Sequence, residues 1–413
     1  TTVNIGTDEY DGQYTEQFRK FTDDLLAYIQ DNGNTVRLWG SLTARNGSTS
    51  VRSEGVQMNI WNDGWANPKS MYQQGYDLID MNDGSVYIVP AAGYYADYLS
   101  RKSMYNYDPA TRMGVPSGSE QTLGGAYAIW NDMVDQRANG LTEMEIYDRF
   151  DDAAPYYAAA LWGKSGEVSF TTAQQTSENV GEAPGVNAYD KVDSETDEIL
   201  SYDFEDGLSD KSANEYDAEN GKNAEVKDGE LVLKGGESYI STPLDKVGPE
   251  KELSFDITLT QPAEPGQILF EAEKDEDHEA YSTHNIRIME DGTLGFTREG
   301  YDYSFGYKLP VNQKMTLKIR TKNGSTVLIA DGKEYKATGS FTYEGDVKKT
   351  GITSSTLSLP LTRIGSDTNA VHAIIDNVNL SSTMSDGASS PIDPSGFTVT
   401  SDNENSDCPI SAA

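Results

Sequence analysis

Residues 3–10 read Val-Asn-Ile-Gly-Thr-Asp-Glu-Tyr, and this stretch decides how the first part of the chain is interpreted. A short apolar run, Val3–Gly6, is followed closely by two adjacent carboxylates, Asp8 and Glu9. Four more runs share its short length and its β-branched or aromatic composition: Val36–Trp39, Val56–Trp61, Val86–Pro90 and Ala126–Trp130. Such runs are typical of strands that are buried on both faces of a parallel sheet.

Segments with helical character lie between several of these runs. We expect helices at Thr15–Gln30, Asn67–Asp80 and Leu141–Trp162. In the first of them, apolar residues recur close to the i, i+3, i+7 spacing of one helix face, at Phe18, Phe21, Leu25 and Ile29. The alternation of strands and helices indicates a parallel α/β architecture.

Side chains that could take part in catalysis or binding follow the end of each predicted strand, which is typical of a TIM barrel. Only five strands are visible, whereas a complete barrel has eight. We therefore predict the C-terminal half of a (β/α)8 TIM barrel over residues 1–164. The expected remainder, about three strand–helix units, would precede Thr1. A signal peptide is also expected there, because we predict a secreted or cell-surface protein.

The sequence changes character after residue 164. Residues 165–197 are polar and aperiodic, and we expect a linker or an extended strap. Residues 198–382 contain alternating apolar and polar runs separated by Asp-Gly turns, which predicts an antiparallel β-sandwich. The runs are Glu230–Lys234, Leu253–Leu259, Gln267–Ala272, Asn285–Met289, Met315–Arg320, Thr326–Ala330 and His372–Leu380. For residues 383–413 we expect a linker and the truncated start of a further β-domain.

The composition excludes several classes of function. With 32 basic and 67 acidic residues the net charge is −35, so the phosphate backbone of nucleic acids would repel this chain. No stretch approaches the roughly 18 apolar residues needed to span a bilayer. The single cysteine, Cys408, excludes an internal disulfide framework and a cysteine-based zinc site. The histidines are His278, His284 and His372, so chemistry in the first 190 residues must use carboxylates, tyrosines or backbone groups.

Asp8 and Glu9 are the leading candidates for catalysis. At the end of a strand the backbone can twist so that both side chains face one site. One carboxyl held near apolar walls would then serve as a general acid while its neighbour stays ionised. The alternative interpretation is a solvated turn, because adjacent acidic residues are frequent in so acidic a chain.

Aromatic residues at strand ends are candidates for substrate binding. Trp39, Trp61 and Trp130 end three separate predicted strands, so their rings would converge and could wall a sugar site. Tyr95 and Asp97 would share one face of an extended segment, where a phenol and a carboxylate can both hydrogen-bond a sugar. Ordinary packing of these aromatic side chains is the alternative.

Six stretches, in chain order, resemble the second half of a glycoside hydrolase family 20 catalytic domain: VNIGTDEY, RLWGS, VQMNIWND, VYIVPAAGYYADYL, MYNYDP and GGAYAIWNDMVD. The resemblance covers roughly residues 1–163. That family includes β-N-acetylhexosaminidases and lacto-N-biosidases. It uses a retaining mechanism in which the substrate's own acetamido group takes part, an exception to the scheme with two catalytic carboxylates.

The resemblance implies a role for each candidate residue. Asp8 would orient and polarise the 2-acetamido group of the substrate, and Glu9 would be the general acid and base. Tyr95 would hydrogen-bond the acetamido carbonyl. Three tryptophans would surround the acetamido methyl, and two aspartates would bind sugar hydroxyls: Trp39, Trp61, Trp130, Asp97 and Asp132.

Two residues depart from the family pattern. The family often has a histidine at the position of Asn4, where its loss would weaken a supporting hydrogen bond. Simple exo-hexosaminidases usually carry glutamate at the position of Asp132, whose shorter side chain leaves room for a substituent on the terminal sugar. The resemblance thus favours a bacterial lacto-N-biosidase that releases Gal-β1,3-GlcNAc. An exo-β-N-acetylhexosaminidase and a non-catalytic glycan-binding or spacer protein are the alternatives.

A second resemblance covers residues 198–382. The stretches LSYDFEDGLSDKSANEYD, VKDGELVLKGGESYIST, ELSFDITLT and HAIIDNVNL resemble a laminin-G-like, concanavalin-type jelly roll. Asp206, Asp210 and Ser212 could bind a structural calcium ion there, or could form a solvated acidic loop, and no other cofactor is expected. His278 and His284 are expected at the surface. The expected partner is an oligosaccharide or glycan, and the sequence does not indicate an oligomeric state.

Overall fold

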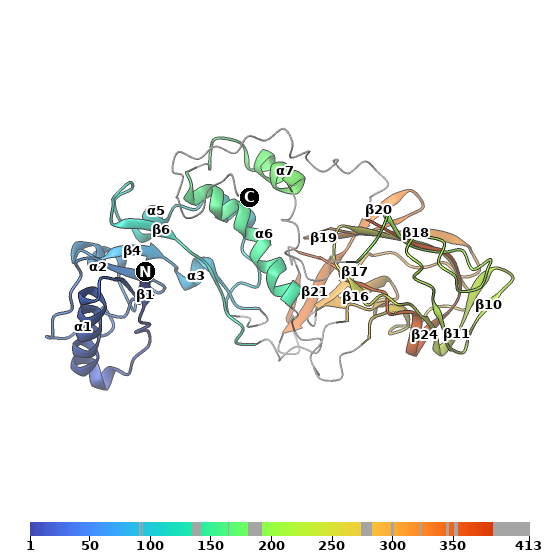
Figure 1. The fold of residues 1–413 in the computed structure, drawn as a ribbon, viewed down its shortest axis with the longest axis horizontal. Helices are drawn as coiled ribbons and strands as arrows, with labels where there is room; N and C mark the ends of the chain where they lie inside the picture. Colours follow the sequence, from blue (N-terminus) through green and yellow to red (C-terminus); the bar gives the residue numbers. More distant parts are fainter. Residues whose placement is uncertain are drawn as a thin grey trace.

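The computed structural model describes residues 1–90, 92, 94–133, 141, 143–163, 165–180, 192–273, 283–298, 301–322, 324–343, 347–350 and 354–382. The residues up to 163 carry a parallel sheet with helices, and those from 198 carry a large antiparallel sheet (Figure 1). We call these the α/β part and the β part. The expected further domain at residues 383–413 lies outside the described residues. Within the described residues, no helix is both long and apolar enough to span a membrane.

The α/β part is built on a five-stranded parallel sheet with the order β1-β2-β3-β4-β6. Its strands are β1 (Thr2–Asn4), β2 (Thr35–Trp39), β3 (Val56–Ile60), β4 (Asp77–Asp80) and β6 (Thr122–Gly125). A separate parallel pair joins β5 (Tyr87–Ile88) to β7 (Ala128–Ile129). The helices that precede β7 are η1 (Gly12–Tyr14), α1 (Thr15–Asp31), α2 (Pro68–Gln73), α3 (Asp83–Val86), α4 (Arg101–Tyr105) and α5 (Pro109–Met113).

Strand β4 corrects the sequence prediction, which placed a helix over Asn67–Asp80. Helix α2 begins as expected, with Pro68 in its first turn, but it ends at Gln73. Gly75 then adopts a φ of +91°, a backbone conformation that helices do not tolerate and glycine reaches freely. Leu78 and Ile79 are buried in the sheet, since β4 pairs with β3 and β6. Their burial between two strands outweighs the weak helical pattern.

The other expected elements of the α/β part are present with small differences. Helix α1 buries Phe18, Leu26 and Ile29, but Phe21 is 58% exposed, so the buried stripe is shifted around the helix. Two of the five expected strands, β5 and β7, pair with each other outside the main sheet. The expected helix at Leu141–Trp162 is α6 (Glu143–Leu161).

A helix lies in the segment that was expected to be an extended strap. Helix α7 spans Phe170–Val180. The ring of Phe170 lies 6.0 Å from that of Tyr105 in α4 and 5.6 Å from that of Tyr156 in α6. This aromatic contact attaches α7 to the α/β part and stabilises the helix despite its polar composition.

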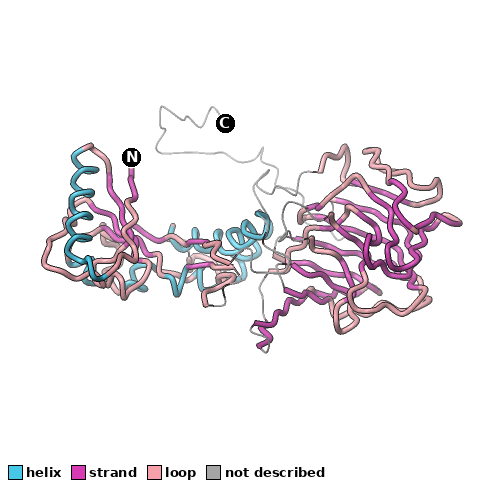
Figure 2. Tube along the Cα trace, turned by 90° about the horizontal axis from the view of Figure 1, so that it is seen from below, coloured by secondary structure: helices cyan, strands magenta, loops and turns pink. Residues whose placement is uncertain are grey.

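All described strand pairs of the β part are antiparallel except for an isolated bridge, as the alternating runs predicted. Its elements are β8 (Glu198–Tyr202), β9 (Glu219–Lys222), β10 (Ala224–Lys227), β11 (Glu230–Ser241), β12 (Lys246–Val247), β13 (Lys251–Leu259), β14 (Ile268–Glu271), β15 (Ile286–Ile288), β16 (Leu294–Arg298), β17 (Tyr301–Ser304), β18 (Met315–Lys322), β19 (Ser325–Ala330), β20 (Lys333–Lys336), β21 (Thr338–Tyr343), β22 (Val347–Thr350), β23 (Leu359–Pro360) and β24 (Arg363–Ser381). The long strand β24 pairs with β8, β11, β13 and β14, so it organises the sheet. Figure 2 shows the β part as a body built of strands and loops.

One apolar core fills the β part. It draws side chains from most of the strands, including Phe255, Phe270 and Phe296, each of which is almost completely buried. Phe255 and Phe270 meet edge to face with ring centroids 4.9 Å apart, an arrangement that aromatic rings favour. From Leu253 to Leu259, buried and partly buried residues alternate along β13, which places every second side chain in this core.

Helix α6 joins the two parts, and Figure 1 shows it between the two sheets. Its side chains Met144, Glu145 and Asp148 are buried. The Glu145 carboxylate contacts His284 of the β part at 2.5 Å. The hydroxyl of Ser358 donates to the sulfur of Met144 over 2.7 Å. The two parts are therefore in direct contact through polar groups rather than tethered by a free linker.

His284 corrects a second prediction, because it is 1% exposed rather than at the surface. Its Nδ1 accepts a hydrogen bond from the backbone N–H of Ser358 at 3.0 Å, so a neutral ring carries its hydrogen on Nε2 and donates it to Glu145. Burial lowers the pKa of His284 below its ordinary value of 6.5, and Glu145 opposes this while Arg298 and Lys246 add to it. The folded protein thus holds His284 neutral.

This arrangement predicts a loss of stability as the pH falls. Below pH 6.5 the unfolded chain binds a proton on His284 that the folded chain resists, so the free energy of unfolding decreases with decreasing pH. The contribution is up to about 1.4 kcal/mol for each pH unit below the ordinary pKa. Chemical denaturation at pH 7.5 and 5.5 gives the change in the free energy of unfolding between these two pH values. The contribution of His284 is the difference between this change in the wild type and in His284→Gln. His372→Gln, in β24, is the matched control and should retain that dependence; equal slopes in the two variants would contradict the prediction.

Candidate active site

Asp8 and Glu9 lie in an exposed turn directly after β1, and the backbone of this turn is strained. Thr7 has a φ of 79° and Glu9 a φ of 49°, and a β-branched residue at positive φ is a clear outlier. Strain of this kind costs on the order of 1–3 kcal/mol per residue and persists only where the surroundings enforce it. Here Trp39 enforces it, because its N–H donates to the Gly6 carbonyl at 2.7 Å and its carbonyl accepts from the Thr7 hydroxyl at 3.2 Å.

Four aromatic rings from different elements form a continuous cluster beside this turn. The ring of Trp130 lies 5.9 Å from Trp39 and 5.6 Å from Tyr87, and Tyr87 lies 5.7 Å from Tyr95. We call Trp39, Tyr87, Tyr95 and Trp130 the aromatic cluster. Burial chiefly raises the pKa of both tyrosines, and the nearby carboxylates add to this, Asp8 at Tyr87 and Glu9 at Tyr95. Because Trp39 both holds the turn that carries Asp8 and Glu9 and belongs to the aromatic cluster, the carboxylate pair and the cluster lie side by side.

Trp61 has a different environment from the other two predicted tryptophans. It is 8% exposed, and its ring stacks on Trp65 at 5.7 Å. Its indole N–H donates to the carbonyl oxygen of Gly40 at 2.9 Å. Trp130, in contrast, is 38% exposed and can still cover a ligand. The structure thus brings Trp39 and Trp130 into one cluster and packs Trp61 beside Trp65.

Asp83 holds Tyr95 in place, and sequence reasoning missed it. The Tyr95 hydroxyl donates to Asp83 Oδ2 at 2.9 Å, and the Asn62 side-chain amide donates to the same oxygen at 2.9 Å. Burial, with the Asp83 carboxylate, raises the pKa of Tyr95 to about 12, so the phenol is protonated at neutral pH. Asp83 follows the end of β4, and the assignment of that strand as helix hid the signal that would have marked it as a strand-end residue.

The other two predicted aspartates lie apart from this hydrogen-bonded group. Asp97 is bound by Arg149 of α6, whose Nε and Nη2 both donate to its Oδ1, at 3.1 and 2.9 Å. Asp132 lies in an exposed turn after β7. Tyr95 and Asp97 therefore face different partners, although both belong to the segment 94–99, which we call the site loop. Their expected roles toward sugar hydroxyls stay predictions.

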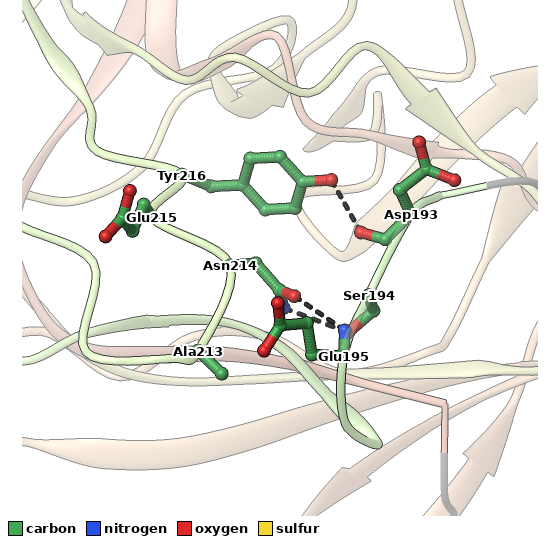
Figure 3. A pocket seen from close by; sticks show the side chains of 7 residues that line it. All are labelled: Asp193, Ser194, Glu195, Ala213, Asn214, Glu215 and Tyr216. Carbon is green, nitrogen blue, oxygen red and sulfur yellow. Dashed lines mark hydrogen bonds between the residues drawn. The ribbon is translucent and has the colours of Figure 1, made fainter.

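A pocket of about 550 Å³ lies elsewhere, in the β part (Figure 3). Its lining is Asp193, Ser194, Glu195, Ala213, Asn214, Glu215 and Tyr216. The side-chain amide of Asn214 donates to the Ser194 hydroxyl at 2.9 Å and to the Ile199 carbonyl at 2.9 Å, and the Tyr216 hydroxyl donates to the Asp193 carbonyl at 2.6 Å. These polar groups hold two loops together, and we attribute a structural role to them.

The acidic loop that could bind calcium or be solvated is organised by Asp210. Its carboxylate accepts hydrogen bonds from the N–H groups of Ser201 and Tyr216 and from the Ser212 hydroxyl, at 2.8, 3.0 and 2.5 Å. Asp206 is paired with Lys211 at 2.5 Å. These hydrogen bonds and this ion pair hold the loop together. In the part of the chain that the structure describes, no group of three or more His, Cys, Asp or Glu side chains could hold a metal ion.

Residues 4–162 match the family model of the glycosyl hydrolase family 20 catalytic domain. The match supports a glycoside hydrolase that acts on N-acetylhexosamine-containing glycans, and it spans the carboxylate pair and the whole aromatic cluster. No curated protein matches the chain. The comparison thus agrees with the resemblance seen in the sequence motifs at the level of the family.

Solved structures give only weak likenesses. Domain 4 of AbnA, a family 43 extracellular arabinanase from Geobacillus stearothermophilus, is 18% identical over 45% of this chain and 91% of its own, with a TM-score of 0.33. Trypanosoma rangeli sialidase is 12% identical over 55% of this chain and 38% of its own, with a TM-score of 0.31. The cellulose-induced protein Cip1 is 13% identical over 45% of this chain and 97% of its own, with a TM-score of 0.29. At these scores the likenesses carry no argument about this chain.

Replacing Asp83 by alanine should impair the site without unfolding the chain. Tyr95 then loses its hydrogen-bond partner, and a displacement of about 1 Å in a positioned group can cost on the order of 100-fold in rate. We expect kcat for a chromogenic N-acetyl-β-glucosaminide or lacto-N-bioside to fall about 10- to 100-fold. Asp24→Ala is the control, since that carboxylate pairs with Lys20 on the exposed face of α1. If both variants keep the same kcat, Asp83 does not support Tyr95.

Proposed function

We propose that this chain carries the acid/base site of a retaining glycosidase that cleaves β-linked GlcNAc-containing glycans, releasing Gal-β1,3-GlcNAc as a lacto-N-biosidase. One observation carries the proposal: Trp39, a member of the aromatic cluster, holds the strained turn that presents Asp8 and Glu9. The match of residues 4–162 to family 20 supports the same chemistry. We further propose that the protein is secreted or displayed at the cell surface, where such glycans are found.

In the proposed reaction the substrate supplies its own nucleophile. The acetamido oxygen attacks the anomeric carbon while Glu9 donates a proton to the leaving glycosidic oxygen and the bond to that oxygen breaks. Asp8 orients the acetamido group and stabilises the positive charge of the oxazolinium that forms. Glu9, now a carboxylate, takes a proton from a water molecule that attacks the same carbon. The ring opens, and two inversions leave the configuration unchanged.

The aromatic cluster supplies the binding surface for this reaction. Rings of Trp39 and Trp130 that meet at 5.9 Å give an apolar wall of the kind that receives an acetamido methyl or a sugar face. Tyr95 is a protonated phenol and so has a hydrogen to offer to the acetamido carbonyl. Asp132 lies in an exposed turn two residues after Trp130, which is consistent with room for a second sugar. This last point favours disaccharide release over release of GlcNAc alone.

Removal of the acid/base should abolish turnover. We expect Glu9→Gln to lower kcat/KM on a chromogenic lacto-N-bioside by about 10²- to 10⁴-fold, the usual contribution of a positioned general acid or base. The exposed Glu54→Gln is the matched control and should retain full activity. Product analysis distinguishes the alternatives: release of GlcNAc alone would indicate an exo-β-N-acetylhexosaminidase. If neither substrate is cleaved by the intact wild-type protein, a non-catalytic glycan-binding role replaces the proposal.

A second variant tests the participation of the acetamido group. Asp8→Asn should lower kcat by at least about 10²-fold, because the oxazolinium loses its stabilising charge. The wild-type protein should also fail to cleave the matched β-glucoside, in which a hydroxyl replaces the acetamido group. Thermal unfolding of Asp8→Asn close to that of the wild type confirms that the fold is intact. Comparable rates on the two substrates would contradict substrate assistance.

A further inference from the structure

A buried polar cluster connects the β part to the site loop. Arg298, at the end of β16, is fully buried. Its Nη1 donates to the carbonyl oxygen of Thr356 at 2.8 Å, and its Nη2 donates to the Asp148 carboxylate at 3.2 Å. The same Nη2 donates to the hydroxyl of Tyr98, which belongs to the site loop. One side chain of the β part therefore contacts both α6 and the site loop.

Helix α6 also binds the site loop directly. Arg149 is fully buried, and its two hydrogen bonds to Asp97 fix the residue next to Tyr98. Its guanidinium carbon lies 4.6 Å from the centre of the Tyr98 ring, within the range of a cation–π contact. The Tyr98 hydroxyl in turn donates to Asp148 at 2.6 Å. Both residues are thus bound by α6 only a few positions after Tyr95.

The start of the site loop is also tied to the aromatic cluster. Ala96 bridges to Ile88 of β5, and its carbonyl accepts from the N–H of Val89 at 2.9 Å. The Tyr95 ring packs against Tyr87, and its hydroxyl binds Asp83. Between these contacts and the buried cluster there are only one or two residues, so a shift of Tyr98 is transmitted to Tyr95.

We propose that Arg298 is a positioning residue for the candidate active site: through Tyr98 and Asp148 it fixes the site loop and so the place of the Tyr95 hydroxyl. This inference rests on the proposed function where it is tested by kcat, because that measurement requires glycosidase activity. It also assigns the β part a role in the reaction beyond that of a spacer. Its contribution is the orientation of a loop that belongs to the other part of the chain.

The chemistry of the buried polar cluster indicates that it orients the site loop and does not merely hold the two parts of the chain together. Well-packed apolar side chains often stabilise a buried contact as well as an ion pair does, so charge is not needed to hold two surfaces together. Directional hydrogen bonds among buried groups instead select one arrangement. Arginine is suited to this because its planar guanidinium donates in several fixed directions at once, here to a carbonyl, a carboxylate and a phenol.

The test compares two buried arginines of the β part. Arg298→Met should lower kcat on the chromogenic lacto-N-bioside about 10- to 100-fold with less than about a threefold change in KM, since a misplaced Tyr95 affects the transition state most. Arg320→Met is the matched control, because Arg320 is also buried and paired with a carboxylate, that of Glu252 at 3.0 Å, but lies in β18. It should lose thermal stability and keep kcat. Arg298→Lys should recover part of the loss.

A readout without substrate separates this inference from the proposed reaction. Hydrogen exchange of a peptide covering residues 94–99 should become faster in Arg298→Met and stay unchanged in Arg320→Met, with the peptide of residues 56–62 as internal reference. Should Arg298→Met not fold, Tyr98→Phe removes the shared hydroxyl with little change in volume and should produce the same local effect. Unchanged exchange in residues 94–99 would overturn the inference. If residues 94–99 exchange faster in Arg298→Met but the wild-type protein cleaves neither the N-acetyl-β-glucosaminide nor the lacto-N-bioside, the positioning role of Arg298 is upheld and the proposed reaction is rejected.

Discussion

Asp148 is the group on which the contact between the two parts depends. Burial raises the pKa of this carboxyl, but Arg298 and the hydroxyls of Thr356, Tyr98 and Ser354 outweigh burial and lower the pKa below its ordinary value. The side chain therefore remains charged inside the protein. Removing one partner of such a buried pair costs about 3–5 kcal/mol, because the remaining charge cannot return to water. This one carboxylate therefore ties helix α6 to the site loop and to the β part.

This constraint explains why the boundary between the two parts is polar. Leu99 attaches the end of the site loop to the apolar core, whereas Tyr94 near its start is 60% exposed. Between these two residues, Arg149 of α6 and Arg298 of β16 hold Asp97 and Tyr98 with hydrogen bonds. The neutral His284, bonded to Glu145 and to the backbone of Ser358, closes the same contact at its other end. A glycosidase domain and a β part that only shared a linker would have no reason to bury these groups.

The sequence predicts the local features of this protein well and its long-range ones poorly. Strands β1, β2 and β3 follow from their apolar runs, and the contact between Trp39 and Trp130 follows from their places at strand ends. Strand β4 could not be predicted in this way. It closely follows helix α2, which begins with a favourable N-terminus, and only its pairing with β3 and β6 makes it a strand.

The buried cluster could not be predicted from any single stretch. Asp148 and Ser354 are 206 residues apart in the chain, and His284 is 139 residues from Glu145, so no spacing marks them as partners. The sequence predicted a surface position for His284, whereas its side chain is buried against a carboxylate from another part of the molecule. Asp83 was missed for a related reason, because its significance depends on β4.

The hydrogen of Tyr95 shows why the placement of the loop matters for the chemistry. A phenol has one hydrogen to donate, and without substrate Tyr95 donates it to Asp83. To bind an acetamido carbonyl, the hydroxyl must turn this hydrogen toward the substrate and leave Asp83 with the amide of Asn62. Hydrogen bonds weaken steeply once their angle falls below about 120°. The Tyr95 oxygen must therefore be placed so that its hydrogen can point well at either acceptor, the Asp83 carboxylate or the acetamido carbonyl. A loop that moved by an ångström would favour one acceptor permanently, either locking the phenol on Asp83 or leaving that carboxylate short of a donor.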